Sequence, residues 1–556
     1  MDNYAIADNF LLLAKLIDIH GDNGFKAKSY ASAAFIIEKL PAQLSTLQAD
    51  KISELRGIGA SIGKKIIEQL HSGRLQELDT YIIKTPVGLF EMLKIKGLGP
   101  KKIATVWKEL EIESIGELLY ACNENRLMLY KGFGGKTQQN IKTSIEFYLN
   151  NQGHYLFSQI EVFANAFTKR LESELNYTFL LTGDFRRQAE VIHKLEWVTD
   201  IDQQSLVTYL TANEYTIEEK EGLIEAKGSE NVAMHFYFTE AVHLYVKLFE
   251  TTGSHEFMHA WHEAYPNSIN SNVTKEEQVF LNNQVAFVPP YLREQASIIN
   301  IARANAIPQV VNVCDIRGII HTHSNWSDGS NTIEEMARGA MDKGFEYLVI
   351  SDHSKSAFYA NGLYPDRIKA QHQLIRELNE ELAPFKIFRS IESDILNDGS
   401  LDYDDMVLSS FDLVIASVHS NLKMNEEKAM ARLLAAIANP YTTILGHMTG
   451  RLLLSRNGYP VDYTTIIEAC AKHKVVIELN AHPRRLDMNW RHIEQATSKG
   501  VLISIDPDAH QVDAFKDIRY GVLAAQKGGL TSQQNLSSFT LKQFEYFLLK
   551  QQAKRR

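Results

Sequence analysis

The sequence predicts a multidomain α/β protein with helical domains at the N-terminus and a parallel, seven-stranded α/β barrel at the C-terminus. Three observations support this. The chain of 556 residues is too long for a single hydrophobic core. A glycine-containing turn followed by a helical segment occurs three times within the first 150 residues. From residue 315 onwards, seven short β-rich segments alternate with helical segments, a pattern that predicts parallel strands joined by crossovers.

The net charge of −10 is unevenly distributed along the chain. Residues 1–150 carry 19 basic and 17 acidic side chains, whereas residues 151–314 carry 11 basic and 21 acidic ones. Nucleic-acid backbones are bound largely through lysine and arginine. The first third is therefore better suited than the acidic middle third to hold DNA.

The few cysteines and the lack of a long apolar segment indicate the cellular setting. The three cysteines, Cys122, Cys314 and Cys470, are far apart, which argues against a disulfide framework or a cysteine zinc site. The sequence has no apolar run of 18 residues of the kind that a membrane helix needs. We expect a monomeric cytoplasmic protein without a membrane segment.

The three glycine turns are built to approach phosphates. They lie in LRGIGASIGKK (55–65), LKIKGLGPKK (93–102) and LYKGFGGK (129–136). Glycine permits a tight turn, and the N-terminus of the following helix offers free N–H groups to an anion. Such turns also occur in plain helix pairs, but three copies resemble the helix-hairpin-helix motif and predict DNA binding without base specificity. The candidate DNA contacts are Gly57, Gly59, Lys64, Lys65, Gly97, Gly99, Lys101, Lys102, Gly132, Gly134 and Lys136.

The segments that follow resemble family X DNA polymerases. TGDFRRQAE (182–190) is similar to the phosphate-gripping turn of that family, FETTGSHEF (249–257) to its later Thr-Gly-Ser turn, and VAFVPPYLRE (285–294) to the end of its thumb domain. The resemblance implies a palm and a thumb in the middle of the chain. It also implies that Lys65 occupies the position of a lysine that can form a Schiff base with an abasic sugar, although a phosphate contact is the simpler explanation of Lys65.

The polymerase chemistry is not expected to have survived. The family binds two Mg²⁺ ions through three aspartates on two neighbouring strands. Here the corresponding positions hold Lys194, Glu196 and His235. A lysine repels the cation, and a neutral imidazole is a poor ligand for Mg²⁺, which needs oxygen ligands in tight octahedral geometry. The sequence thus predicts a degenerate palm.

The β-rich segments of the last third end in metal-binding side chains. Six of the seven segments have a histidine, aspartate or glutamate at the C-terminal end, where sites gather in α/β barrels. Residues two apart on a strand point to the same side and can hold one ion together. The mixed nitrogen and oxygen set predicts two or three divalent ions, Mn²⁺ or Zn²⁺, with iron as a further option. The candidate ligands are His321, His323, Asp328, His353, Glu392, His419, His447, Asp508 and His510.

This set resembles the PHP domain, a family of trinuclear phosphoesterases that bacterial family X polymerases carry at the C-terminus. The resemblance implies that the eight ligands other than Asp328 are also catalytic, and that metal-bound hydroxide attacks phosphorus. Next to the strand ends, Asp352 and His482 could orient ligands or substrate. Four cations could hold phosphates, or else form ordinary salt bridges: Lys355, Arg451, Arg484 and Arg485.

Together these observations predict five domains: helical domains at 1–85 and 86–150, a degenerate palm at 151–240, a thumb-like domain and linker at 241–312, and a PHP domain at 313–556. The preferred interpretation is a DNA-repair 3′–5′ exonuclease, with abasic-site cleavage or 3′-phosphatase activity as further options. Its DNA partners would be gapped or carry free 3′ ends. A bifunctional polymerase–exonuclease and a DNA-binding scaffold fused to a histidinol-phosphatase-like enzyme are the alternatives.

Overall fold

The computed structural model describes residues 1–123, 127, 130–150, 153–228, 231–266, 273–454 and 457–555. The chain forms two compact units, residues 1–152 and residues 153–556. Each unit is described by itself below. The multidomain α/β fold class predicted from the sequence is confirmed.

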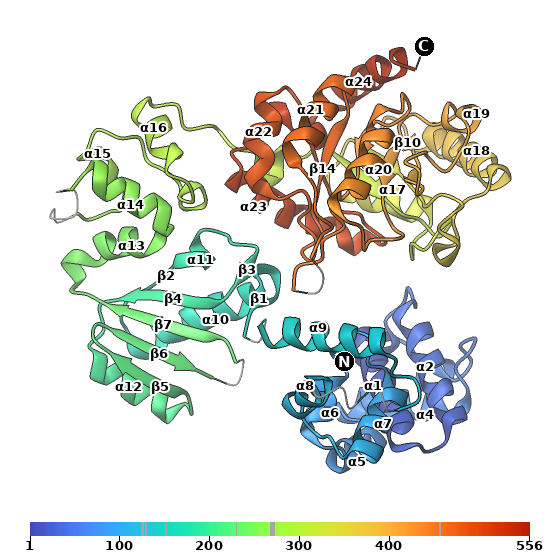
Figure 1. Ribbon diagram of the computed structural model, residues 1–556, viewed down its shortest axis with the longest axis horizontal. Coiled ribbons are helices and arrows are strands. Elements are labelled where there is room, and N and C mark those ends of the chain that lie inside the picture. The colour runs from blue at the N-terminus through green and yellow to red at the C-terminus, as the bar shows by residue number, and fades with distance from the viewer. Residues whose placement is uncertain are drawn as a thin grey trace. The chain divides into compact units, whose positions relative to one another are not determined.

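The first unit is entirely helical in its described residues (Figure 1). One continuous hydrophobic core runs through it from Ile6 to Ile145, so the expected boundary at residue 85 lies inside a shared core. The finer division of the chain stays a proposal. The helices are α1 (Asn3–His20), α2 (Gly24–Glu38), α3 (Ala49–Ile52), α4 (Ala60–Ser72), α5 (Gln76–Lys84), α6 (Val87–Met92), α7 (Pro100–Leu110), α8 (Ile115–Asn123) and α9 (Gly135–Asn150).

The three glycine turns adopt the expected geometry. The first glycine of each turn has a positive φ, +86° at Gly57, +86° at Gly97 and +92° at Gly132, which residues with a side chain rarely adopt. The second glycine directly precedes or caps the next helix: Gly59 caps α4 and Gly99 caps α7. The turns therefore present helix N-termini, as a phosphate site requires.

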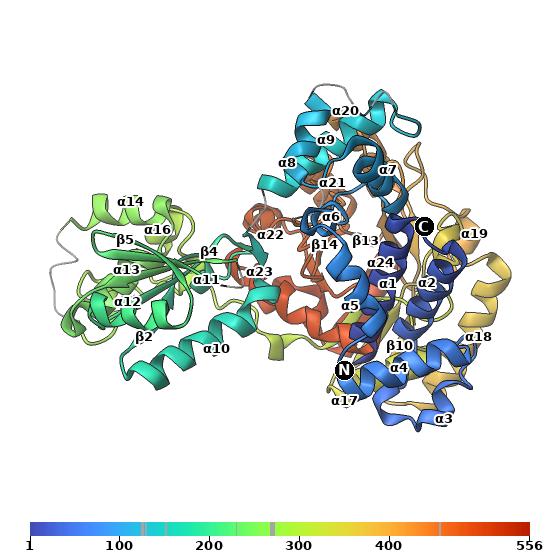
Figure 2. The same ribbon diagram turned by 90° about the horizontal axis from the view of Figure 1, so that it is seen from below.

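The second unit begins with a five-stranded sheet of order β2-β4-β7-β6-β5. Strands β4 and β7 are parallel and the other neighbours are antiparallel. Helix α10 (Phe157–Leu175) packs against β2 and α12 (Gln203–Ala212) against β5 (Figure 2). The strands are β2 (Phe179–Thr182), β4 (Lys194–Thr199), β5 (Thr216–Lys220), β6 (Leu223–Lys227) and β7 (Ala233–Phe238). A short strand pair, β1 (Tyr155–Leu156) with β3 (Val191–Ile192), flanks this sheet.

Four helices with a core of their own follow the sheet. Their core is rich in aromatic side chains, among them Phe249, Trp261 and Phe280. The helices are α13 (Leu244–Thr252), α14 (His255–Ala264), α15 (Glu277–Leu281) and α16 (Ser297–Arg303), and the one-turn helix α11 (Gly183–Arg186) lies between β2 and β3 in the chain.

The last part of the second unit is the parallel α/β barrel. Its strands form two sheets, of order β10-β9-β8 and β11-β12-β13-β14-β15. Two parallel bridges join the sheets: one from Thr322 of β8 to Ala509 after β15, and one from His353 after β9 to Glu392 of β11. The strands are β8 (Gly318–Thr322), β9 (Tyr347–Ile350), β10 (Lys386–Arg389), β11 (Glu392–Asp394), β12 (Ile415–Ser417), β13 (Ile444–Leu445), β14 (Val476–Asn480) and β15 (Ile503–Asp506).

Helices cover the outside of this barrel and bury its main core. A second apolar cluster lies around Tyr347, Phe388 and Phe544, where the last helix packs on the strands. The helices are α17 (Ile333–Asp342), α18 (Pro365–Glu381), α19 (Asp405–Leu408), α20 (Glu426–Ala438), α21 (Tyr463–His473), α22 (Ile493–Ser498), α23 (Ile518–Lys527) and α24 (Leu541–Ala553).

The seven predicted β-rich segments correspond to eight strands. The third segment, IFRSIESDIL, divides into β10 and β11, which belong to different sheets. Between them, Ser390 N donates to Ile350 O of β9, and Ile415 N of β12 donates to Ile391 O. The chain therefore changes partners at 390–391, and this change distorts the barrel.

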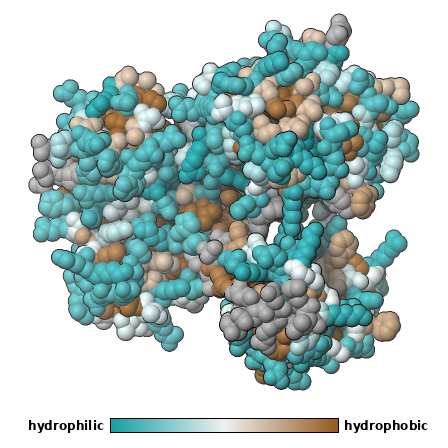
Figure 3. All heavy atoms as spheres, viewed as in Figure 1, coloured by the Kyte–Doolittle hydropathy of each residue, from teal (hydrophilic) through white to brown (hydrophobic). Residues whose placement is uncertain are grey.

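No helix among the described residues is both long and apolar enough to cross a membrane. On the face seen in Figure 3, hydrophilic residues predominate and the hydrophobic ones form small separate patches.

Candidate metal centre

The barrel strands deliver the predicted ligands to one place. His321 lies in β8 and His323 directly after it, and Glu392 begins β11. The backbone is strained at two of the ligands, because His321 has φ of +62° and Asp508 of +52°, a region that residues other than glycine seldom adopt. The remaining ligands follow the ends of their strands: His353 after β9, His419 after β12, His447 after β13, and Asp508 and His510 after β15.

Three groups of side chains could each hold a cation among the described residues, and all three lie in this barrel. Within each group the ligand atoms are no more than 4.8 Å apart. His323 belongs to two of the groups, and His353 also belongs to two, so the groups form one connected cluster. The groups are His323, Asp328, His353 and His510; His321, His323 and Asp508; and His353, Glu392 and His419.

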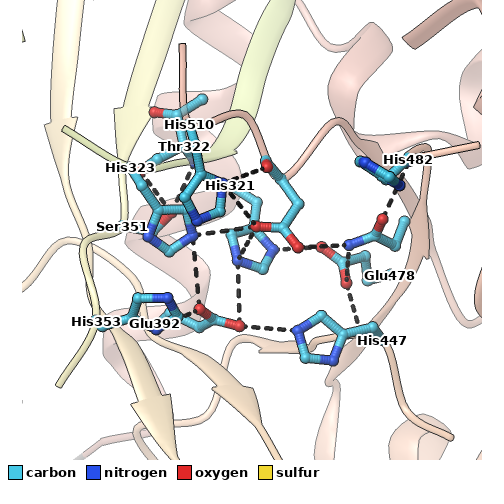
Figure 4. Close-up of polar contacts among 12 residues, drawn as sticks. His321, Thr322, His323, Ser351, His353, Glu392, His447, Glu478, His482 and His510 are labelled. Carbon is cyan, nitrogen blue, oxygen red and sulfur yellow. Dashed lines mark hydrogen bonds and ion pairs between the residues drawn. The ribbon is translucent and has the colours of Figure 1, made fainter. Parts of the chain in front are cut away.

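Glu392 contacts several histidines of the cluster, among them His353 and His447 (Figure 4). Its Oε1 is 3.0 Å from His419 Nε2 and 3.0 Å from His447 Nε2, and its Oε2 is 3.0 Å from His353 Nδ1. His447, which is outside the three groups, thus joins the cluster through this carboxylate. All nine predicted ligands are brought together, and their role as ligands stays a prediction.

The hydrogen bonding of the cluster is incomplete in a way that fits metal ions. Buried atoms without a hydrogen-bond partner include Nε2 of His321, Nδ1 of His323, Nδ1 of His447 and Oε2 of Glu392. Leaving buried polar atoms unpaired is costly. Several such nitrogen and oxygen atoms converging on one place are a donor set that divalent transition-metal ions complete.

The charges of the cluster favour ionised carboxylates. Burial raises the pKa of Glu392, but the neighbouring His419, His321 and His353 outweigh burial and hold the pKa well below its usual value. Burial lowers the pKa of His419, but Glu392 and Asp394 outweigh it and raise the pKa to about 10. The neighbouring carboxylates likewise outweigh burial at His321 and raise its pKa. Without a cation, His321 and His419 therefore carry the compensating positive charge, and metal ions would replace their protons.

Two carboxylates behind the ligands were missed by the sequence reasoning. Glu478 Oε1 is 2.5 Å from His321 Nδ1, and Asp394 contacts His419 Nδ1. Such a carboxylate fixes the imidazole tautomer and leaves Nε2 free for a metal. The signal was present in the spacing: Asp394 follows the ligand Glu392 by two residues, and Glu478 interrupts the apolar run VVIELNA of β14.

Asp352 organises the loop that carries Asp328. It is fully buried and accepts hydrogen bonds from Ser324 N, Ser324 Oγ, Ser327 Oγ and Gln371 Nε2. The same Ser327 Oγ lies 3.3 Å from Asp328 Oδ1. Asp352 is thus placed to orient a ligand, one of the two roles that the sequence suggested for it.

The four predicted phosphate-binding cations differ in their surroundings. Arg485 Nε is 3.7 Å from Asp508 Oδ2, beside the ligands. Arg484 is exposed. Lys355 Nζ lies 5.1 Å from the centre of the Tyr403 ring. Arg451 instead pairs with Glu190, at 2.5 Å. Arg485 is therefore the cation best placed to meet a phosphate bound at the cluster.

His482, the other predicted orienting residue, lies beside the cluster (Figure 4). Its backbone N–H donates to Asn480 Oδ1, and its Nδ1 accepts from Arg484 N. Asn480 Nδ2 also donates to Asp508 Oδ2 at 3.1 Å. His482 is thus connected to the ligands through Asn480.

The expected polymerase positions lie together on the sheet of the second unit. Glu196 of β4 is directly opposite His235 of β7. Lys194 Nζ is 2.7 Å from Glu196 Oε1, and Tyr237 OH donates to the same oxygen. A Cβ atom added at Gly183 would lie 1.8 Å from Glu196 Oε2, so the Glu196 carboxylate packs tightly against the turn and is neutralised by protein partners.

The arginines of that turn also have protein partners. Arg186 forms two hydrogen bonds to Glu276, at 2.7 and 2.8 Å. Arg187 contacts Asp184 and Glu294. Both guanidinium groups are thereby neutralised by carboxylates and are not displayed to solvent as free phosphate-binding groups.

The hairpin lysines fall into two kinds. Lys64, Lys101 and Lys136 are exposed, as contacts to a DNA backbone require. Lys102 Nζ donates to Gly97 O within its own turn. Lys65 is half-buried and pairs with Glu77 at 2.7 Å.

Glu77 also binds Lys26 and accepts a hydrogen bond from Tyr30. Burial raises the pKa of Glu77, but its hydrogen bonds to Lys26, Lys65 and Tyr30 outweigh burial and lower the pKa to about 2. Glu77 is therefore charged at neutral pH and holds Lys65 in an ion pair.

Comparisons with known proteins agree with this organisation. A helix-hairpin-helix domain family matches residues 1–75, a SAM-like helix-hairpin-helix tandem family matches residues 90–146, and the PHP domain family matches residues 320–482. The chain is 28% identical to the probable phosphatase TTE1963 of Caldanaerobacter subterraneus over 34% of this chain and 74% of that protein. It is 28% identical to the probable phosphatase YcdX of Escherichia coli O81 over 34% of this chain and 77% of that protein.

One similarity spans nearly the whole chain. The DNA polymerase/3′-5′ exonuclease PolX of Bacillus subtilis is 31% identical over 577 aligned residues, which cover 96% of this chain and 97% of that protein. A match of this extent takes in both the helical first unit and the barrel with its candidate metal-ligand groups. The chain therefore belongs to the family of PolX-type DNA polymerase/3′-5′ exonucleases, and its C-terminal barrel is a PHP domain of the metal-dependent phosphoesterase kind.

Proposed function

We propose that this protein is a metal-dependent phosphodiesterase that removes nucleotides from the 3′ ends of DNA and no longer extends primers. The observation that carries the proposal is the connected cluster of three ligand groups in the barrel. The nine side chains and the unpaired buried atoms among them support two or three bound ions of Mn²⁺ or Zn²⁺ character.

Bound ions would supply hydroxide near neutral pH and neutralise charge on the phosphate. The chain's own residues do the rest. Glu478 and Asp394 hold the imidazoles of His321 and His419 in one tautomer. Arg485 lies beside Asp508, where its charge can meet a phosphate next to the scissile bond.

The loss of polymerase activity is proposed from the palm. Of the three positions that hold aspartates in the family, only Glu196 still carries an acid, and it is held by Lys194 and Tyr237. None of the three ligand groups found among the described residues includes it. Phosphoryl transfer depends almost wholly on positioning and charge neutralisation by Mg²⁺, so a palm with this ion pair in place of the metal ligands should be inactive.

The exposed lysines of the glycine turns favour a polynucleotide substrate. They support sequence-independent contacts to DNA gaps or 3′ ends, since they add charge without reading bases. The similarity to probable phosphatases favours a second candidate, hydrolysis of a small phosphomonoester by the barrel. Comparing kcat/KM for end-labelled DNA and for histidinol phosphate separates the two candidates.

The decisive variant is His321→Ala with His323→Ala. It removes two ligands, so we expect hydrolysis of 3′-labelled gapped DNA to fall at least about 100-fold, the upper end of what removing an outer partner of a ligand costs. Metal content by elemental analysis should fall as well. The matched control is His255→Ala with His259→Ala, which removes two exposed histidines from α14. Wild-type rates in the first variant would disprove the assignment of the nuclease to this site.

A further inference from the structure

The turn that resembles a polymerase phosphate grip is bonded to the PHP domain. Glu190 Oε1, at the end of that turn, is 2.5 Å from Arg451 Nη2, and the two side chains are only 12% and 13% exposed. The PHP match, residues 320–482, contains Arg451 but not Glu190. The charge partner of Arg451 thus comes from the palm, a part of the chain that contributes no ligand to the metal cluster.

Arg451 uses its other donors to hold a loop of the barrel. Its Nε donates to Arg485 O at 2.9 Å, and its Nη2 contacts Leu486 O as well as Glu190. The backbone nearby is paired too, because Leu453 N donates to Arg484 O at 2.6 Å. Arg451 therefore fastens the segment 482–487, named here the Arg485 loop, and its guanidinium has protein partners instead of facing a substrate phosphate.

The Arg485 loop touches the ligand cluster. Arg485 Nε lies 3.7 Å from Asp508 Oδ2. The loop is also tied to the end of β14, where Asn480 N donates to Asp487 O at 2.6 Å and Asn480 Nδ2 donates to Asp508 Oδ2. A shift of this loop would therefore move the Arg485 guanidinium relative to a metal-binding carboxylate.

Glu190 is itself held rigidly. Its backbone oxygen accepts from Phe157 N at 3.1 Å. Three residues earlier, Arg187 O accepts from Lys527 Nζ of α23, a buried lysine that also pairs with Glu294 at 2.5 Å. The turn is thus anchored to α23 of the PHP domain at Arg187 and to α10 of the palm at Glu190 itself, which gives Arg451 a fixed partner.

We propose that Glu190 is a positioning residue for the hydrolytic site, acting through Arg451 to hold the Arg485 loop so that Arg485 faces the phosphate next to the scissile bond. The inference rests on the proposed phosphodiesterase function. The degenerate palm would then have a structural role in hydrolysis, because Glu190, at the end of its phosphate-gripping turn, positions the substrate-binding side of the metal cluster. Arg451 is accordingly a positioning residue as well.

The test compares Glu190→Gln with Glu161→Gln in the full-length, metal-loaded protein. Both variants remove a carboxylate that bonds the palm to the PHP domain, but Glu161 contacts Arg519 and Tyr520 on α23 and not Arg451. A misplaced substrate contact can cost up to about 100-fold. We expect Glu190→Gln to lower kcat/KM on 3′-labelled DNA between about 10- and 100-fold, chiefly through KM, with metal content unchanged. Glu161→Gln should keep the wild-type rate, and Glu190→Asp should recover part of the loss.

A double-mutant cycle separates positioning from general support of the fold. In an Arg485→Ala background, Glu190→Gln should have no further effect on kcat/KM, because the residue it positions is gone. Equal losses in Glu190→Gln and Glu161→Gln, or a full additional loss in the Arg485→Ala background, would overturn the inference. So would a wild-type rate in Glu190→Gln. A wild-type protein that hydrolyses neither DNA nor small phosphate esters would instead refute the proposed function itself, and this inference with it.

Discussion

Replacing Glu478 by glutamine tests whether the carboxylate behind His321 is required for metal binding. Both Glu478 oxygens serve donors in a fully buried position: Oε1 is 2.5 Å from His321 Nδ1, and Oε2 accepts the His447 backbone N–H at 2.5 Å. Glutamine offers one acceptor and one N–H₂ group. One of the two donors must therefore lose its acceptor, or His321 must change tautomer and point an N–H at the metal.

The magnitude follows from this mismatch. Leaving one buried donor unpaired costs about 1–3 kcal/mol, and each 1.4 kcal/mol is about a factor of ten in affinity. The range agrees with the roughly 10- to 100-fold loss usual for an outer partner of a metal-binding histidine. We expect Mn²⁺ affinity to fall by that factor at one of the sites, and hydrolysis to recover at high Mn²⁺ concentration.

The assay is calorimetric titration of metal-free protein with Mn²⁺, followed by elemental analysis of the loaded protein. Glu468→Gln is the matched control, because it makes the same chemical change at an exposed glutamate that pairs with Lys499. If Glu478→Gln bound Mn²⁺ with wild-type stoichiometry and affinity, the orienting role of Glu478 would be wrong.

Four further outcomes are expected. No primer extension should occur with Mg²⁺ and dNTPs, even in a His321→Ala background without nuclease activity, and extension at about 1 s⁻¹, a usual enzymatic rate, would contradict the degenerate palm. If the triple variant Lys194→Asp, Glu196→Asp, His235→Asp gained primer extension, that gain would support the strand alignment. The affinity for DNA should fall steeply as the salt concentration rises. The fall should be less steep in the triple variant Lys64→Ala, Lys101→Ala, Lys136→Ala, and an unchanged salt dependence would count against the glycine turns as the DNA contact. Borohydride should trap the protein on abasic DNA only if Lys65 leaves its ion pair with Glu77. Trapping that is lost in Lys65→Ala but kept in Lys64→Ala would establish a Schiff base at Lys65. Mn²⁺ binding should weaken as pH falls, because His419 and His510 must each lose a proton to bind the ion. Burial lowers both pKa values, but Glu392 outweighs burial at His419 and Asp328 outweighs it at His510, which raises the pKa values to about 10 and about 9. Equal Mn²⁺ affinity at pH 6 and pH 8 would contradict this.

The sequence predicted the parallel α/β barrel and its ligand cluster because both depend on local order. Ligands follow the ends of parallel strands, and the ends of parallel strands meet on one side of a barrel. That rule was sufficient to bring His321 and His510, almost 190 residues apart, into one cluster. It did not single out Glu478, which lies within an apolar strand and not at its end.

The third β-rich segment shows a second limit. IFRSIESDIL is apolar enough to be read as one strand, yet it forms β10 and β11 in separate sheets. Strand limits depend on which neighbours accept each backbone group, and those neighbours come from distant parts of the chain.

By itself the sequence determined the fold class, the positions of the glycine turns, and which candidate ligands would meet in the barrel, because residue type and spacing decide these locally. Only the tertiary structure decided the partner of each charge. Lys194 pairs with Glu196, and Arg186 pairs with Glu276. Arg451, for which a phosphate contact and a salt bridge were both open, pairs with Glu190 and holds the Arg485 loop in place. The physical reason is that an ion pair depends on distance in space and on shared burial, and residues 261 positions apart in the chain carry no local signal that they will meet.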